Sequence, residues 1–230
     1  MSTILLVRHG QASWGKKDYD VLTDLGHRQA RLTGEALRDR GVRPDVVVVG
    51  GLRRQQLTAS ALIDAAGWQT QPQIDAGWDE YDHTAIITGH RPAYRSMTVM
   101  KADLARTFRP YRAFMLMFEK AMVRWAEGEH DEDYPETFTA FCTRVEDAFE
   151  RLLSRLGPTD TAVVCSSAGA ITWALTTVLD GDPYLWGRLQ RVMMNASIST
   201  VTVETAGPLV LTFNEHQHLA AGGPGTITSR

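Results

Sequence analysis

The chain has 230 residues, of which 43% are hydrophobic and 22% are charged. This length and composition suit a globular domain with a substantial core and exclude a mainly disordered chain. The 24 Lys and Arg residues against 27 Asp and Glu residues give a net charge of −3, without the basic surplus typical of proteins that bind nucleic acid or membrane surfaces. Two cysteines, Cys142 and Cys165, are too few for a disulfide framework, so we expect a reducing compartment, the cytoplasm.

The first half of the chain alternates short apolar runs with helical patterns, and its helices carry recognisable caps and stops. The predicted elements are a strand at Thr3–Val7, a helix from Thr23 to Gly41, a strand at Asp45–Val49, a helix at Arg53–Ala66 closed by Gly67, and a strand at Thr70–Ile74. Strands alternating with helices predict a three-layer α/β fold, in which helices cover both faces of a largely parallel sheet.

The second half returns to this pattern after an interruption. The predicted elements are a long helix after Pro135, a strand at Thr161–Cys165, a helix from about Ala170 to Leu179, and strands near Ile198–Val203 and Leu209–Phe213. Between the halves, residues 84–134 show helical spacings such as Met115, Phe118 and Met122, which predict a helical insertion over the active site. We therefore expect a single domain over residues 1–219 with this insertion, and a mobile tail over the glycine-rich residues 220–230.

Polar side chains follow the predicted strands where ligands bind in open parallel α/β sheets, just beyond the carboxyl ends. They are Arg8, His9, Gly10 and Gln11 after the first strand, Arg53 and Arg54 after the second, residues 79–83 after the third, and residues 166–169 after the fourth. Guanidinium groups bind phosphate oxygens, a neutral imidazole can attack phosphorus, and a carboxylic acid can protonate a leaving alkoxide. The set predicts a phosphate pocket with an acid beside it.

Several segments resemble one known family in the right order along the chain. Leu5-Leu6-Val7-Arg8-His9-Gly10-Gln11 resembles the signature of the histidine phosphatase superfamily, the phosphoglycerate-mutase-like proteins. The other matching segments are Leu22–Gly26 with Gln29-Ala30, Leu52-Arg53-Arg54 with Thr58-Ala59, Asn195, Phe213-Asn214-Glu215 and His218-Leu219. The resemblance implies the phosphoglycerate-mutase-like α/β fold and a reaction that needs no metal or other cofactor.

The resemblance also implies the roles of individual residues. His9 is the expected phosphorylated nucleophile, and Arg8 and Arg54 are the expected phosphate ligands, with Arg53 as the register alternative for Arg54. Glu80 is the expected proton donor, in competition with Asp79 and Asp82. Gln11, Arg53, Ser167 and His83 are further expected substrate-binding residues, and His83 is included for its position in the loop after the third strand rather than for the resemblance.

The chain departs from the family pattern at three positions. Ser167 stands where the family has a second catalytic histidine, and Ala12 and Gly15 stand where it has a hydroxyl residue and an asparagine. A serine hydroxyl can donate a neutral hydrogen bond, but it cannot replace a positive charge. His83, three residues beyond Glu80, is the candidate for compensation, with an ordinary surface histidine as the alternative.

The leading hypothesis is a metal-independent phosphatase, a phosphoric monoester hydrolase, that acts on a small phosphorylated metabolite. The alternatives are a phosphate-binding or regulatory protein with low turnover and a phosphoglycerate-type mutase. The insertion is expected to select the substrate, with Arg91, Arg95 and Lys101 as unranked candidates. For His216 and His218 we expect packing and hydrogen-bonding roles rather than metal binding, because a third ligand at suitable spacing is missing. Neither nucleic acid nor membrane is expected as a partner, and self-association into a homo-oligomer stays open.

Overall fold

The computed structural model describes residues 1–13 and 20–229, so Gly15 lies outside the described residues. The chain divides into two compact units. The first combines Met1–Glu80 with Arg144–Arg230, and the second is Tyr81–Thr143. The single-domain boundaries predicted from the sequence, and the place of the insertion over the active site, stay predictions.

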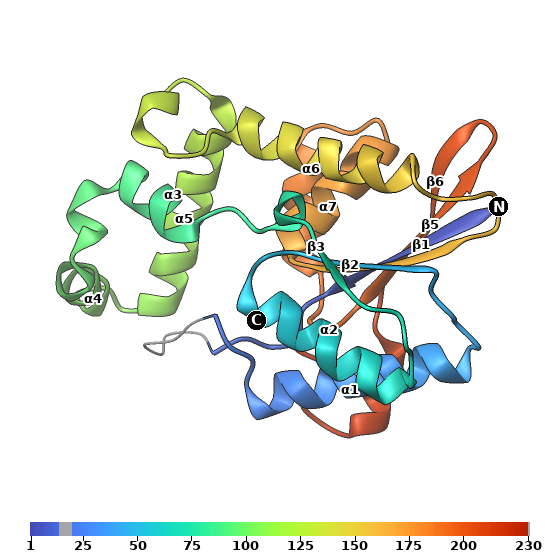
Figure 1. Ribbon diagram of the computed structural model, residues 1–230. Helices are drawn as coiled ribbons and strands as arrows, with labels where there is room; N and C mark the ends of the chain where they lie inside the picture. The colour runs from blue at the N-terminus through green and yellow to red at the C-terminus, as the bar shows by residue number, and fades with distance from the viewer. Residues whose placement is uncertain (14–19, 230) are drawn as a thin grey trace. The chain divides into compact units, whose positions relative to one another are not determined.

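A six-stranded sheet forms the centre of the first unit (Figure 1). Its strands are β1 Ser2–Arg8, β2 Val46–Val49, β3 Gln73–Ile74, β4 Thr161–Ser166, β5 Ile198–Glu204 and β6 Gly207–Glu215. They follow the order β3-β2-β4-β1-β5-β6, in which the first four are mutually parallel and the last two are antiparallel to their neighbours. The predicted largely parallel sheet is confirmed, although β3 is only two residues long.

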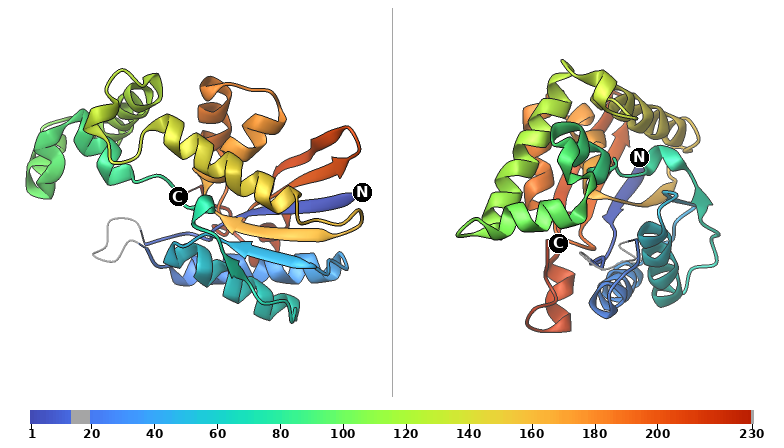
Figure 2. Two further views of the ribbon diagram at one scale, coloured as in Figure 1. Left: turned by 45° about the horizontal axis from the view of Figure 1, so that its top comes forward. Right: turned by 90° about the vertical axis from the view of Figure 1, so that its left-hand side faces the viewer.

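Helices cover both faces of this sheet, with α1 and α2 on one face and α6 and α7 on the other (Figures 1 and 2). The helices and 3₁₀ turns that belong to this unit are α1 Asp24–Asp39, α2 Arg53–Ala66, η1 Ala76–Trp78, α6 Phe138–Leu153 from Arg144 onward, α7 Ala168–Val178, α8 Pro183–Val192 and η4 Gln217–Gly222. The Thr23 hydroxyl accepts the Gly26 amide at 3.0 Å and caps α1, whereas Gly67 ends α2 in the left-handed conformation with φ of 70°. These local signals explain why α1 begins, and why α2 ends, where the sequence predicts.

One buried cluster of the core lies between the sheet and the pair α1 and α2. Side chains that alternate along the strands pack against these helices, and the buried cluster consists of Leu5, Val7, Leu37, Val47, Val49, Ala59, Leu62, Val163, Cys165 and Ile198. Complete burial raises the pKa of the Cys165 thiol to about 12, so this cysteine packs as a small apolar side chain and is not a reactive thiolate.

The second unit is helical, as predicted for the insertion. Its elements are α3 His83–His90, η2 Pro92–Arg95, α4 Met97–Ala105, α5 Pro110–Glu127, η3 Asp131–Asp133 and the first residues of α6. Trp125 packs against Tyr81, Phe138 and Phe141 with ring centroids 5.1–5.7 Å apart. The buried residues of α5 are Met117, Ala121 and Trp125, so the stripe that begins at exposed Met115 does not mark the buried face. None of the described helices is long and apolar enough to cross a bilayer.

The C-terminal segment makes specific contacts with the first unit, and the mobility that its glycines predict stays a prediction. Thr226 is only 1% exposed, and its carbonyl accepts a hydrogen bond from the Gln29 side chain at 2.7 Å. The backbone N–H of Asn195 donates to the Thr228 carbonyl, also at 2.7 Å. Gly223 and Gly225 have positive φ values of 82° and 83°, so the glycines here form turns that bring the segment onto the first unit.

His218 predicts a pH dependence of stability. Its Nε2 lies 3.0 Å from the Thr33 hydroxyl and 3.2 Å from the Ala196 carbonyl, and burial lowers the pKa of His218 from 6.5 to about 4. The unfolded chain therefore takes up a proton at a higher pH than the folded chain, and stability is lost as the pH falls from about 6.5 to about 4. We expect this group to lower the free energy of unfolding by about 2–3 kcal/mol over that window.

Urea unfolding of the wild type and His218→Asn at pH 7.5 and pH 4.5 measures this effect. The variant should lose less stability on acidification than the wild type, whereas His27→Asn, a change on α1, should lose as much as the wild type. Equal losses in the wild type and His218→Asn would contradict the prediction.

Candidate functional site

His9 lies directly after β1, where neighbouring strands fix its backbone. Its N–H donates to the Ser166 carbonyl at 2.8 Å, and its carbonyl accepts the Ala196 amide at 3.2 Å. The side chain is 6% exposed, and Nδ1 lies 2.7 Å from the Gly10 carbonyl. Because a carbonyl oxygen only accepts, Nδ1 carries the proton and the lone pair of the neutral ring is on Nε2. Nε2 is therefore the atom that can act as a nucleophile.

The turn after His9 requires its glycine. The Gly10 amide donates to the Thr58 hydroxyl at 3.1 Å, and a Cβ at Gly10 would collide with the backbone carbonyl of Gly26. The side chain of Gln11 accepts a hydrogen bond from the Thr23 hydroxyl at 2.9 Å. Gln11 therefore ties the turn to the start of α1, and its substrate contact stays a prediction.

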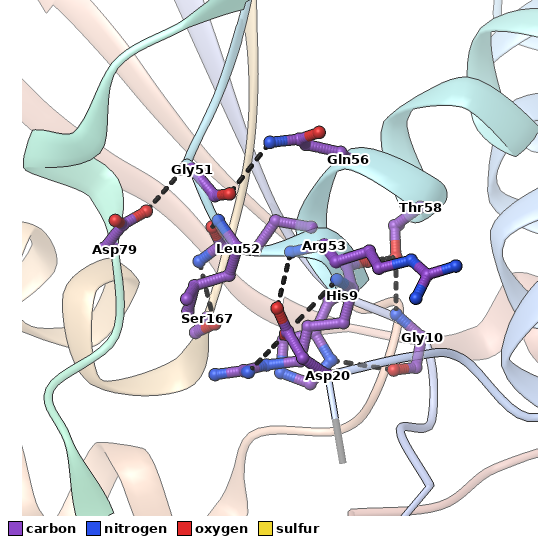
Figure 3. A network of polar contacts seen from close by, with 12 residues as sticks. His9, Gly10, Asp20, Gly51, Leu52, Arg53, Gln56, Thr58, Asp79 and Ser167 are labelled. Carbon is purple, nitrogen blue, oxygen red and sulfur yellow. Dashed lines mark hydrogen bonds and ion pairs between the residues drawn. The ribbon is translucent and has the colours of Figure 1, made fainter. Parts of the chain in front are cut away.

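The two arginines after β2 lie in different environments at the start of α2. Arg54 is 4% exposed and its guanidinium is paired with Asp20, with NH1 2.8 Å from Oδ1, whereas Arg53 is exposed. Figure 3 shows Asp20 with its hydrogen bond to the backbone N–H of Arg53, which is 2.8 Å long. Arg53 and Arg54 therefore differ in burial, and the choice between them as the phosphate ligand stays a prediction. Asp20 is not among the site residues predicted from the sequence.

Arg8, the last residue of β1, donates from its guanidinium to two backbone carbonyls. These belong to Met193 and, at 3.2 Å, to Ser229. Arg8 is thus linked to the C-terminal segment described above, and its contact with phosphate stays a prediction.

Asp79 and Glu80 follow the short turn η1, which one arginine holds in place. Arg144 NH1 donates to the carbonyls of Ala76, Gly77 and Asp79 at 3.0–3.1 Å. Glu80 Oε2 accepts the backbone N–H of Gly169, in the first turn of α7, at 3.0 Å. The Glu80 carboxyl group is therefore fixed against the helix that follows β4. Arg144 is likewise not among the residues predicted from the sequence.

Asp79 is the second carboxyl group of the site. It accepts the backbone N–H of Gly51, and burial raises the pKa of Asp79 above its ordinary value, although the Gly51 hydrogen bond and the charge of Arg144 oppose the shift. Asp82 instead caps α3, accepting the amides of Thr84 and Ala85 at 2.7 and 3.1 Å. Asp79 consequently remains a competitor of Glu80 as the acid, whereas the contacts of Asp82 are those of a helix cap.

Ser167, which replaces the second histidine of the family, is completely buried at the N-cap of α7. Its hydroxyl oxygen accepts a hydrogen bond from Gln55 Nε2 at 2.9 Å, and the same Nε2 donates to the Trp78 carbonyl at 3.2 Å. A neutral hydroxyl and a neutral amide thus occupy the region where the family has an imidazole. The sequence offered no signal for Gln55 beyond its place one residue after Arg54.

The remaining candidates belong to the second unit. His83 begins α3, and its ring lies 4.7 Å from that of Tyr81 and 5.9 Å from that of Phe118. Its role in compensation stays a prediction. Arg91 is paired with Asp103 at 3.2 Å, and the other candidate cations for substrate selection, Arg95 and Lys101, are exposed.

These groups are of the types that phosphoryl transfer uses. In the first unit, the imidazole of His9 follows β1 and the buried guanidinium of Arg54 follows β2. Two carboxyl groups follow η1, and burial raises the pKa of one of them, Asp79. Within residues 1–13 and 20–229, no three His, Cys, Asp or Glu side chains are grouped as metal ligands would be.

Comparisons with known proteins agree with this chemistry. The family described as the histidine phosphatase superfamily (branch 1) matches residues 4–98 and 107–216. A 2,3-bisphosphoglycerate-dependent phosphoglycerate mutase from Chelativorans sp. (strain BNC1) is 33% identical over 88 residues, which cover 35% of this chain and 43% of the mutase. A protein of the same name from Mesorhizobium japonicum is 39% identical over 89 residues, with the same coverage. The match thus spans less than half the length of these relatives.

Solved structures share the fold at low sequence identity. A phosphoserine phosphatase from Entamoeba histolytica, in complex with phosphoserine, has a TM-score of 0.65 at 18% identity, covering 95% of this chain and 100% of that chain. A phosphoglycerate mutase from Bacillus anthracis has a TM-score of 0.66 at 14% identity, covering 96% of both chains. Because the family match extends over both units and nearly the whole sheet, the chain belongs to the histidine phosphatase superfamily.

Proposed function

We propose that the protein is a metal-independent phosphatase of a small phosphorylated metabolite and that it works through a phosphohistidine on His9. The observation that carries the proposal is the contact between Nδ1 and the Gly10 carbonyl, which leaves the lone pair of a buried imidazole on Nε2. A nucleophile of this kind divides the displacement at phosphorus into two easier steps.

The two steps balance with the groups present. In the first, Nε2 forms a bond to phosphorus as the ester bond breaks, and Glu80 gives its proton to the leaving alkoxide. In the second, water attacks the phosphohistidine, Glu80 takes the proton of the water, and inorganic phosphate leaves. The guanidinium of Arg54 offsets the negative charge of the phosphoryl oxygens in both steps.

A phosphate-binding protein with low turnover is the second candidate. It is favoured by the neutral pair of Ser167 and Gln55, which supplies no positive charge where the family has a histidine. A mutase is the third candidate, because the matching curated relatives are named as phosphoglycerate mutases. A mutase must keep the phosphoryl group on the enzyme while the substrate reorients, whereas a phosphatase passes it to water.

A panel of phosphate monoesters, including phosphoserine and 3-phosphoglycerate, separates the three candidates. The assay contains EDTA and measures both inorganic phosphate and isomerised product, with His9→Ala as the control. Release of phosphate that depends on His9 is the expected result. Isomerisation without release would favour the mutase, and phosphate binding without either product would favour the binding protein.

The replacement of the second histidine leads to a further prediction. If His83 supplies the missing donor, His83→Ala should lower kcat by about 10²-fold, comparable to the loss of one oxyanion-type donor, and Ser167→His should raise kcat. Steady-state kinetics of both variants with the same substrate measure the effect, and His90→Ala, also on α3, is the matched control. Normal turnover in His83→Ala, together with rescue of a nearly inactive protein by Ser167→His, would contradict compensation and favour the binding protein.

A further inference from the structure

Asp20 meets the start of α2 with both carboxylate oxygens. Oδ2 accepts the backbone N–H of Arg53 at 2.8 Å, and Oδ1 accepts the backbone N–H of Arg54 at 3.4 Å. Oδ1 also lies 2.8 Å from NH1 of the Arg54 guanidinium. One carboxylate thus contacts both the backbone and the side chain of Arg54. Figure 3 shows Asp20 with its hydrogen bond to Arg53 at the start of α2.

These contacts supply two things that the helix lacks. The N-cap of α2 is Leu52, whose side chain has no oxygen to accept the first helical N–H groups. The Arg54 side chain is only 5% exposed, and a buried guanidinium is strongly destabilising without a counter-charge. Asp20, with 37% of its side chain exposed, provides the acceptor and the counter-charge together.

We propose that Asp20 is the positioning residue of Arg54. Its carboxylate holds the guanidinium at NH1, so that other N–H donors of the same guanidinium can bind the phosphoryl group. This inference rests on the proposed function. A guanidinium has five N–H donors in a rigid plane, so a contact at NH1 orients the plane without occupying all of its donors.

The contacts also argue against the opposite role, in which Asp20 is a competitor that phosphate displaces from Arg54. Phosphate would supply a new counter-charge to the guanidinium, but departure of the carboxylate would still remove the hydrogen-bond acceptor from both backbone N–H groups. Each of these losses is unfavourable, so retention of the pair during phosphate binding is the lower-energy arrangement.

Calorimetric titration with inorganic phosphate distinguishes the two roles by the sign of the effect. Asp20→Ala should weaken phosphate binding by about tenfold or more, since a charged hydrogen bond to phosphate depends on the position that Asp20 maintains. Asp20→Asn should be intermediate, because its amide oxygen can still accept from the same donors. Asp24→Asn, an exposed change in the first turn of α1, should bind as the wild type does. Tighter binding by Asp20→Asn would overturn the proposal.

A double-mutant cycle tests whether Asp20 acts through Arg54. In an Arg54→Ala background, Asp20→Ala should weaken phosphate binding by no more than about twofold, because the group that it positions is already gone. With a substrate that the protein hydrolyses, Asp20→Ala should raise KM by a larger factor than it lowers kcat. The KM of Asp20→Asn should lie between those of the wild type and Asp20→Ala. An additive loss in the double variant would overturn the proposal.

Failure of the positioning role is distinguishable from failure of the proposed function. Absence of phosphate binding by the wild type would refute the proposed function. Urea unfolding of the wild type, Asp20→Ala, Arg54→Ala and the double variant then tests the inference. The Asp20→Ala and Arg54→Ala changes should be coupled by more than about threefold in the unfolding equilibrium constant if Asp20 holds Arg54. Uncoupled effects would overturn the inference independently of any ligand.

Discussion

Replacing His9 by alanine should lower the turnover of phosphate monoesters by roughly 10⁴-fold or more. Alanine has no nitrogen that can attack phosphorus, so the reaction loses its covalent step and retains only the binding of the phosphoryl group. The prediction depends on the ring nitrogen Nε2, because Nδ1 is committed to the Gly10 carbonyl at 2.7 Å. Steady-state release of inorganic phosphate measures the loss.

The covalent step can be observed directly by stopping the reaction with labelled substrate. The wild type should retain a label that is stable in base and released in acid, as expected for phosphohistidine, and His9→Ala should retain none. His27→Ala, a histidine change on α1 outside the proposed site, should behave as the wild type. Persistence of the label in His9→Ala, or turnover within about tenfold of the wild type, would assign the nucleophile to another residue.

Local signals explain how much of the fold could be predicted from the sequence. The end of helix α2 at Ala66 was predicted because Gly67, which follows it in the left-handed conformation, is a stop signal that the local sequence carries. Helix α8 was not predicted, although Asp182 caps the Leu185 amide at 2.9 Å and Pro183 follows it, a signal that the sequence does contain. The contacts of the C-terminal segment with Gln29 and Asn195 could not be predicted, because these residues are distant in the sequence and glycine content carries no information about them.

The candidate site, like the fold, could be predicted from the sequence only in part. The position of the polar residues at one edge of the sheet follows from the parallel strand order, which the alternation of strands and helices predicts. Their partners do not follow, because they are far away in the chain: Arg54 and Asp20 are 34 positions apart, and Gln55 and Ser167 are 112 positions apart. Spacing identifies the residues that can do chemistry, whereas tertiary contacts decide how each is charged and oriented.

Two carboxyl groups compete for the role of acid, and their contacts lead to different expectations. Glu80 accepts one hydrogen bond from the start of α7, at Gly169, whereas Asp79 is held by the Gly51 amide and lies within the field of Arg144 and Arg54. Burial raises the pKa of Asp79, which favours a proton on that group at higher pH than usual. The raised pKa of Asp79 alone therefore does not decide which of the two groups is the acid. The dependence of the reaction rate on the leaving group does decide it.

Glu80→Gln should slow alkyl phosphates by about 10²–10⁴-fold and p-nitrophenyl phosphate by less than about tenfold. An alkoxide leaves only if it receives a proton, whereas p-nitrophenolate is stable enough to leave without one. The glutamine oxygen can still accept the Gly169 amide, so the variant removes the acidic proton and keeps the hydrogen bond seen at 3.0 Å. Asp79→Asn is the matched variant, since it makes the same change one residue earlier, and it should slow both substrates equally if Asp79 serves structure. Equal losses on both substrates in Glu80→Gln, with leaving-group dependence in Asp79→Asn, would transfer the acid role to Asp79.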